Sequence, residues 1–301
     1  MTDEEKRKAF ERARLAVLKA RTRIQRDTRA EIVRLLEAAA ARIKATLADQ
    51  PSDYQLWQLG ELQREIGRTL AEVGGQAADG ISSSAGQAWE AGQELIERPL
   101  AAGGIRVLGL APAIDTRQLF AMRTFMADRI KDITLSAANQ INSELGLVVI
   151  GAQPSSEAIG NISAILGESS RARATTIVRT ELGRVFSVAA NERMQQAAPF
   201  LPGLKKQWRR SGKLHSRFHH DAADGQVQPV DQPFVLQGPT GRVTLRFPRD
   251  PLAPAGETIN CGCESLPLME SWDVAQPGRR PFTPEEIARN RLRAELGGAA
   301  A

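Results

Sequence analysis

EEKRKAFERARLAVLKARTRIQRDTRAEIVRLLEAAAARIKATLA, which spans residues 4–48, decides the fold of this chain. Its apolar residues recur mostly at intervals of three, four or seven, with arginine, lysine and glutamate between them. This is the period of one face of an α-helix. The stretch therefore predicts one long amphipathic helix. Its expected apolar face consists of Phe10, Val17, Ile24, Ile32, Leu35, Ala39, Ile43 and Leu47.

Helix signals continue beyond this stretch. Pro51 breaks the pattern, and Ser52 or Asp53 can cap a second helix that runs to Leu70, which predicts a helical hairpin. Residues 74–109 are rich in glycine and small residues and define no strong face. Four further elements are expected before residue 199. The first is a helix capped by Asp115 or Thr116, with an apolar face from Leu119 to Leu135. A short β-prone segment at 146–151, a helix from Pro154 to about Gly167 and a helix from Ser169 to about Ala198 follow it.

The composition changes after Pro199, where aromatics, prolines and glycines become frequent. The predicted fold is mainly α, with a long helical N-terminal half followed by a small α+β domain that contains short antiparallel strands. Residues 1–168 are expected to form the helical region, 169–268 the α+β domain, and 269–301 a tail with one short helix starting at Thr283. Strands are expected at Lys206–Arg209, Val227–Val230, Phe234–Gln237 and Val243–Phe247.

Charge and composition narrow the class of protein. The 301 residues include 40 basic and 35 acidic ones, and the formal charge of +5 favours an acidic partner. No apolar run approaches the roughly 20 residues that a membrane-spanning helix needs, and the charged N-terminus does not resemble a signal peptide. We therefore expect no membrane segment and synthesis in the cytoplasm. The two cysteines, Cys261 and Cys263, are too close in sequence for an unstrained disulfide, so they are free thiols or metal ligands.

Four segments together resemble a known family. They read RATTIVRTEL (173–182), KKQWRRSGKLHSRFHHDAADGQ (205–226), FPRDP (247–251) and INCGC (259–263). In order and spacing they are similar to the C-terminal domain of the phage Mu F-like head morphogenesis family. Two positions differ: Gly262 stands where that family frequently has arginine between the cysteines, and His215 stands where an acidic residue is common.

The resemblance implies a minor capsid protein of a tailed bacteriophage. Such a protein is present in low copy in the procapsid and acts near the portal in assembly, DNA packaging or DNA delivery. The implied partners are the portal protein and the major capsid or scaffolding protein. The implied location is the virion, in the head interior or at the portal vertex, after assembly in the host cytoplasm. The residues that carry the family motifs here are Arg179, Glu181, Trp208, Arg217, Asp224, Gly225 and Asn260.

The histidines and cysteines suggest a metal site. His215, His219 and His220 lie within six residues, and both cysteines follow about forty residues later in the same expected domain. Imidazole and thiolate are the usual ligands of structural zinc, and a small domain gains most from such a crosslink. The hypothesis is a zinc site formed by His220, Cys261, Cys263 and either His215 or His219, where His220 is favoured because it occupies the family's motif position. The alternative is a set of buried thiols and hydrogen-bonded histidines without metal.

Arg179 and Glu181 are two residues apart on one predicted helix and so do not share a face. We expect each to reach a different part of the β-rich segment in a buried ion pair, Arg179 with Asp224 or Glu181 with Arg217. Asp224 and Gly225 form a turn signal, in which glycine supplies a positive φ.

Two other functions compete with head assembly. A Cys-His hydrolase would use Cys261 or Cys263 as nucleophile, His220 as base and Asp224 to orient it, but no nucleophile signature surrounds the thiols, so we expect no enzyme. A DNA-binding protein inside the head would use double-stranded DNA as partner through the basic first helix, although acidic residues interrupt its positive face and a solvated surface explains it equally well. The candidate contact residues for DNA or portal are Arg14, Lys19, Arg21, Arg23 and Arg26.

Overall fold

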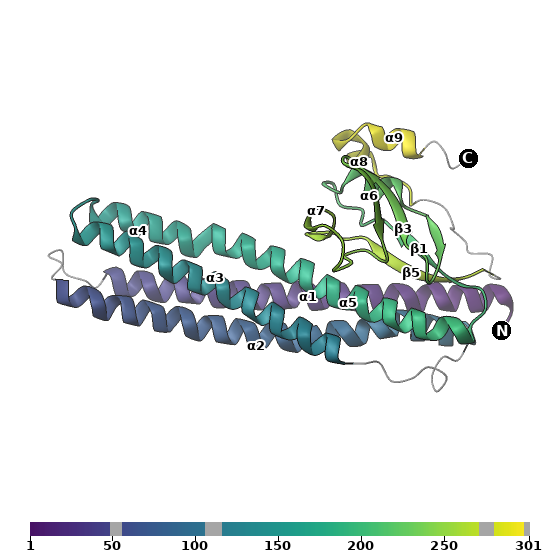
Figure 1. The fold of residues 1–301 in the computed structure, drawn as a ribbon, viewed down its shortest axis with the longest axis horizontal. Helices are drawn as coiled ribbons and strands as arrows, with labels where there is room; N and C mark the ends of the chain where they lie inside the picture. The colour runs from purple at the N-terminus through teal and green to yellow at the C-terminus, as the bar shows by residue number, and fades with distance from the viewer. Residues whose placement is uncertain (49–55, 106–115, 271–279, 298–301) are drawn as a thin grey trace. The chain divides into compact units, whose positions relative to one another are not determined.

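The computed structural model describes residues 1–48, 56–105, 116–270 and 280–297 (Figure 1). The chain forms two compact units. The helical unit comprises residues 24–86 and 117–181, and the mixed unit comprises residues 1–23, 87–116 and 182–301. Long helices α1 (Asp3–Ala48), α2 (Leu56–Ala102) and α5 (Ser170–Ala197) each contribute residues to both units. The predicted fold class, mainly α with a small set of short antiparallel strands, is confirmed.

The helical unit is built from parts of α1, α2 and α5 together with α3 (Arg117–Val149) and α4 (Ser155–Ala164). Figure 1 shows these helices side by side. One apolar cluster joins four of them, and its members from α1 and α2 lie on the faces predicted from the sequence. The predicted face of α3 is corrected in part, because Phe125 and Leu135 are exposed and the cluster uses Ala137, Ile141 and Leu145. The most buried members are Ile43 from α1, Ile66 from α2, Ile141 from α3 and Ile162 from α4.

The second helix is much longer than the sequence predicted. α2 continues to Ala102 through the glycine-rich residues 74–102, where no strong face was expected. The small residues are the reason, because they let neighbouring helices approach closely. A Cβ added to Gly92 would lie 2.5 Å from the carbonyl oxygen of Phe186 on α5, and one added to Gly74 would collide with Thr134 on α3. Packing therefore favours the helix where propensity alone disfavours it.

The β-prone segment at 146–151 is also helical, which corrects the prediction. α3 runs to Val149 and ends in a Schellman motif, in which Gly151 has a φ of 71°. The amide of Ala152 donates to the carbonyl of Leu147 at 2.9 Å, and the amide of Gly151 donates to Val148 at 3.0 Å. The apolar run thus belongs to the last turn of a helix, since short apolar runs do not distinguish strand from helix.

The next two predicted helices are confirmed. α4 begins at Ser155, immediately after Pro154, and joins α5 through a π-helical segment, Ile165–Ser169. Gly167 within this segment has non-helical angles, φ −87° and ψ −110°, so the predicted helix end coincides with a kink. The expected caps at Ser52, Asp53 and Asp115 lie outside the described residues.

Two small sheets form the β part of the mixed unit. β1 (Leu204–Arg209) is the centre of an antiparallel sheet with the order β2-β1-β5, in which β2 is Val227–Pro229 and β5 is Glu264–Met269. β3 (Phe234–Gly238) and β4 (Gly241–Leu245) form a hairpin. The four predicted strands are confirmed, but β5 was missed because Pro267 interrupts its sequence. As an edge strand, β5 tolerates that proline, which lies opposite Lys206 of β1.

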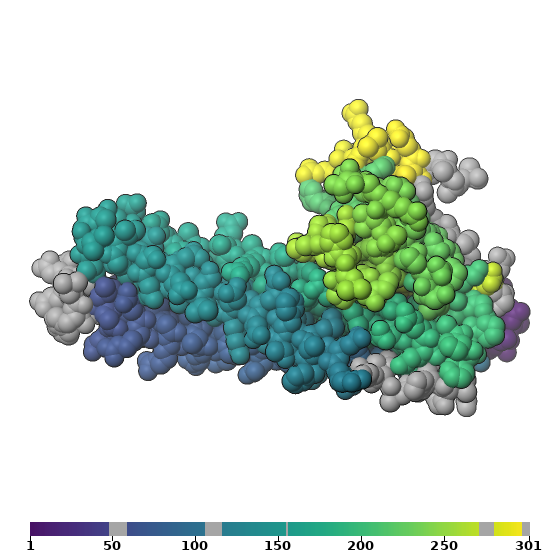
Figure 2. All heavy atoms as spheres, viewed as in Figure 1, coloured from purple at the N-terminus to yellow at the C-terminus, as the bar shows by residue number. Residues whose placement is uncertain are grey.

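The described part of the C-terminal tail, residues 280–297, holds two helices instead of the single one predicted: α8 (Pro284–Arg289) and α9 (Leu292–Gly297). The predicted start is confirmed as a capping box, in which Thr283 accepts from the Glu286 amide and Glu286 accepts from the Thr283 amide. Extended backbone at Asn290 ends α8, and its side chain accepts from the Leu292 amide at 3.1 Å. Figure 2 shows these helices in yellow, lying on green atoms of the mixed unit.

Among the described residues, no helix is both long enough and apolar enough to cross a membrane.

Candidate functional site

His220 lies on the short helix α6 (Phe218–Ala222) and is 1% exposed. Trp208, near the end of β1, holds this helix, because its indole Nε1 donates to the His220 carbonyl at 3.0 Å. The two rings also pack edge to face, with centroids 5.4 Å apart. The motif tryptophan therefore fixes both the backbone and the ring of His220.

Both cysteines lie on the loop of residues 259–263, between α7 (Ala255–Thr258) and β5. Asn260 has a φ of 56°, a left-handed conformation that asparagine tolerates better than most residues. Cationic side chains hold three successive carbonyls of the loop: Arg217 donates to Ile259 at 2.9 Å, Lys213 to Asn260 at 2.8 Å and Arg249 to Cys261 at 3.0 Å. These contacts fix the loop so that both thiols face α6.

The thiols meet one nitrogen of His220. Nδ1 lies 3.6 Å from the Cys261 sulfur and 3.8 Å from the Cys263 sulfur. Nε2, on the other side of the ring, lies 2.7 Å from Oε2 of Glu257, and the same oxygen lies 2.7 Å from Nε2 of His219. The result is a chain of groups from two thiols through an imidazole to a carboxylate.

The protonation of these groups is strongly perturbed. The hydrogen bond with Cys263, followed by those with His220, lowers the pKa of Cys261 well below its ordinary value despite burial. The hydrogen bond with Cys261 and burial instead raise the pKa of Cys263. Burial lowers the pKa of His220, but hydrogen bonds with Cys261 and Glu257 outweigh it and the net shift is upward. Cys261 is therefore the better thiolate, and a thiolate is both a metal ligand and a nucleophile.

A cavity of about 330 Å³ reaches these groups. His220, Cys261 and Cys263 line it, together with Lys213, His215 and Arg217 among others. The thiols are buried, with Cys261 5% and Cys263 2% exposed, so the cavity gives a small molecule or ion its route to them.

The structure separates the predicted ligands. It brings His220, Cys261 and Cys263 together, whereas His215 is exposed and only lines the cavity. His219 contacts Glu257. The prediction that Asp224 orients His220 in a hydrolase was wrong. Glu257 contacts His220 instead, and Asp224 accepts a hydrogen bond from the backbone amide of Arg210 at 2.8 Å.

Other motif residues have structural partners. Gly225 has a φ of 84°, as its turn signal predicts. Asp224 pairs with Arg209 and Arg210, which replaces the expected pair with Arg179, an exposed residue. Glu181 is buried at 4% exposure.

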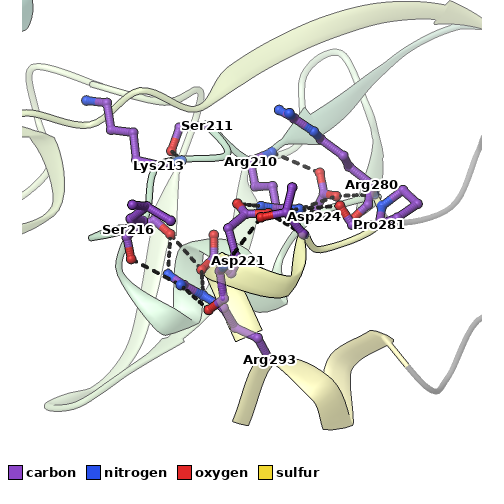
Figure 3. A network of polar contacts seen from close by, with 12 residues as sticks. Arg210, Ser211, Lys213, Ser216, Asp221, Asp224, Arg280, Pro281 and Arg293 are labelled. Carbon is purple, nitrogen blue, oxygen red and sulfur yellow. Dashed lines mark hydrogen bonds and ion pairs between the residues drawn. The ribbon is translucent and has the colours of Figure 1, made fainter. Parts of the chain in front are cut away.

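A network of buried charges joins the C-terminal tail to the part of the mixed unit that carries α6 (Figure 3). Arg210 donates to Glu286 on α8 at 2.6 Å, and Arg293 on α9 donates to Asp221 at 3.0 Å. Asp224 also accepts from the Arg280 amide at 2.5 Å. The tail thus contacts α6, the helix that carries His220, through the neighbouring residue Asp221.

The candidate basic surface of α1 is divided. Arg14 and Arg21 are largely buried in ion pairs, Arg14 with Glu11 and Arg21 with Glu264, so their charges are already neutralised. The three exposed members of the set are Lys19, Arg23 and Arg26, of which Arg26 pairs with Asp27.

Sequence reasoning missed four residues of the site and its support. They are Glu257, Arg249, Glu286 and Arg293, which lie on loops or short helices with no periodic signal. The signals that were available were the FPRDP segment around Arg249 and the capping box around Glu286. Neither signal indicates which residue the side chain would contact.

Comparisons with known proteins give two partial matches. The chain is 37% identical over 125 residues to the uncharacterized protein YqbB of Bacillus subtilis, which covers 40% of this chain and 38% of YqbB. It is 29% identical over 103 residues to the NAD(+)--arginine ADP-ribosyltransferase EFV of Enterococcus faecalis, which covers 34% of this chain and 20% of that protein. The chain therefore spans well under half the length of these curated relatives. No family model matches the chain, and no solved structure matches it.

Proposed function

We propose that this chain is a minor head protein of a tailed bacteriophage, a structural component that acts beside the portal in head assembly, DNA packaging or DNA delivery. One observation carries the proposal: three of the four segments that resemble the Mu F-like family interlock in the mixed unit. Arg217 and Lys213 of the second segment bind the backbones of Ile259 and Asn260, and Arg249 of the third binds that of Cys261. Motif residues that bind one another's backbone serve a shared architecture.

The proposed partners are the portal protein and the major capsid or scaffolding protein, and the proposed location is the virion. Double-stranded DNA is the weaker candidate partner, because Arg14 and Arg21 have carboxylate partners of their own. A contact through phosphates would weaken steeply as salt rises, whereas a packed protein interface would not.

The test is to purify procapsids and mature heads from the phage or prophage that encodes this chain and to identify their proteins by mass spectrometry. We expect the chain at low copy in portal-containing procapsids, with cross-links to the portal protein. The major capsid protein serves as the internal reference. Absence of the chain from both procapsids and mature heads during a productive infection would overturn the proposal.

A thiol hydrolase is the second candidate, favoured by the relay from Cys261 through His220 to Glu257. In such an enzyme the Cys261 thiolate attacks an acyl carbon and His220 protonates the leaving group. Turnover of an activated ester that disappears in both Cys261→Ser and His220→Ala would support it. Equal turnover by wild type and both variants would eliminate it.

A further inference from the structure

The separations of three side-chain atoms fit one coordinated metal ion. Zinc binds imidazole nitrogen at about 2.0–2.1 Å and thiolate sulfur at about 2.3 Å, so two such ligands in a tetrahedron stand about 3.6 Å apart. Nδ1 of His220 lies 3.6 Å and 3.8 Å from the two cysteine sulfurs. Both nitrogen–sulfur separations are therefore those of a zinc tetrahedron, and all three ligand atoms lie within 4.8 Å of one another.

The neighbouring cluster of His219, His220 and Glu257 does not fit a metal in the same way. Nε2 of His219 and Nε2 of His220 each lie 2.7 Å from the same carboxylate oxygen of Glu257. Tetrahedral nitrogen and oxygen ligands at about 2.0–2.1 Å from zinc would stand about 3.3 Å apart. The shorter distance is that of a hydrogen bond. Glu257 is thus a hydrogen-bonding partner of His220.

This partner is the one that a metal-binding histidine requires. Histidine ligands commonly donate their second ring N–H to a carboxylate, which fixes the tautomer and orients the ring. With the Nε2 proton directed at Glu257, the lone pair of Nδ1 points at the two sulfurs. A single Nδ1 proton could serve only one sulfur at a time, whereas a metal ion serves both.

The surroundings favour thiolates. Arg249 is 1% exposed and lies against the loop, where it binds the Cys261 carbonyl. Gly262 lets the loop pack closely against the residues that follow β1. A Cβ added at Gly262 would lie 2.8 Å from Cβ of Ser211 and 2.9 Å from Cε of Lys213. Nitrogen and sulfur ligands select zinc over magnesium or calcium.

We propose that His220, Cys261 and Cys263 bind one Zn²⁺ ion, that Glu257 orients His220 for it, and that the fourth coordination position faces the cavity. The ion would join α6 to the loop before β5, two segments 41 residues apart. Both cysteines would bind as thiolates, so their two negative charges balance the charge of the ion. This inference does not depend on the assembly function, and either can fail without the other.

The experiment uses the full chain, purified without chelators from zinc-supplemented medium. We expect one zinc per chain by elemental analysis. After replacement by Co²⁺, we expect the thiolate-to-metal absorption and the strong visible bands of a tetrahedral site. Wild-type protein that retains no stoichiometric zinc and shows no such Co²⁺ spectrum would overturn the proposal, and this readout does not depend on whether a variant folds.

Variants then assign the ligands. Cys263→Ser should lose the metal, whereas His215→Ala, the matched histidine control that lines the same cavity, should retain it. Loss of metal in His215→Ala would overturn the open fourth position. Glu257→Gln should weaken zinc affinity by about 10- to 100-fold in a chelator competition. Unchanged affinity in Glu257→Gln would overturn its orienting role.

Discussion

Glu286 and Arg210 form an ion pair in which both side chains are almost fully buried, at 3% and 0% exposure. Arg210 also donates to the carbonyl of Pro281 at 2.6 Å. Burial raises the pKa of Glu286, but the hydrogen bonds from Arg210 and the Thr283 amide outweigh burial, and the net pKa is lower than the ordinary 4.5. The ionised carboxylate is therefore favoured by folding.

This pair predicts a pH-dependent contribution to stability. A folded-state pKa below 4.5 stabilises the protein above pH 4.5, and the contribution is lost as pH falls through the folded-state value. Glu286→Gln keeps a residue that can form the capping box but removes the charge. We expect this variant to be less stable than wild type above pH 4.5, and the difference in free energy of unfolding to shrink at lower pH.

Denaturant unfolding between about pH 3 and 7 measures this difference. The matched control is Glu285→Gln, because Glu285 is the exposed neighbour on the same helix. A Glu286→Gln deficit that stays constant across this range would contradict the prediction.

At the scale of elements, α2 shows how packing extends a helix past weak local signals. Its buried positions include the small residues Ala77, Ala78, Ala85, Ala88 and Ala91, which lie between large ones such as Trp89 and Leu95. Small side chains contribute little apolar area, so the face is weak in the sequence. The close approach that they allow supplies dispersion contacts in its place.

The glycines of α2 therefore differ in what they do. Gly92→Ala places a methyl group against the Phe186 carbonyl oxygen and the Ala189 side chain, and we expect it to destabilise the protein by about 1–3 kcal/mol. Gly67→Ala meets no atom within 4 Å, and we expect it to be neutral or stabilising by up to about 1 kcal/mol. Thermal and denaturant unfolding measure the change in the free energy of unfolding for both variants. Equal effects would show that close packing does not set the role of Gly92.

At the scale of the whole molecule, each compact unit combines segments that lie far apart in the sequence. The expected division at residue 169 stays a prediction, while the mixed unit includes residues 1–23 and 87–116 in addition to 182–301. Specific contacts link these parts of the mixed unit: Arg21 pairs with Glu264, and Glu97 pairs with Arg193.

A fragment of residues 169–301 lacks Arg21, Glu97 and the Gly92 contact with α5. We expect it to melt at a lower temperature than the full chain and to be cleaved faster by protease. A loss of about 2 kcal/mol would lower the melting temperature of a roughly 100-residue domain by on the order of 10 °C. The control is the full chain of 301 residues, which ends at the same residue as the fragment. A fragment that melts with the full chain would contradict the prediction.

The sequence by itself determined the elements whose signals are local. The face of α1, four of the five strands in the described part of the chain, and the capping box at Thr283 follow from side-chain periodicity, β-propensity and turn chemistry within a few residues. The same reasoning identified His220, Cys261 and Cys263 as candidate ligands, because imidazole and thiolate are zinc-binding groups wherever they lie.

Only the tertiary structure decided which groups meet. Glu257 faces His220, Asp224 faces Arg210 in place of Arg179, and His215 lies apart from the thiols. It also decided that α2 continues through its glycines and that Pro267 lies in an edge strand. These outcomes depend on contacts between residues far apart in the chain, whose free energy comes from burial and pairing that no local window of sequence contains.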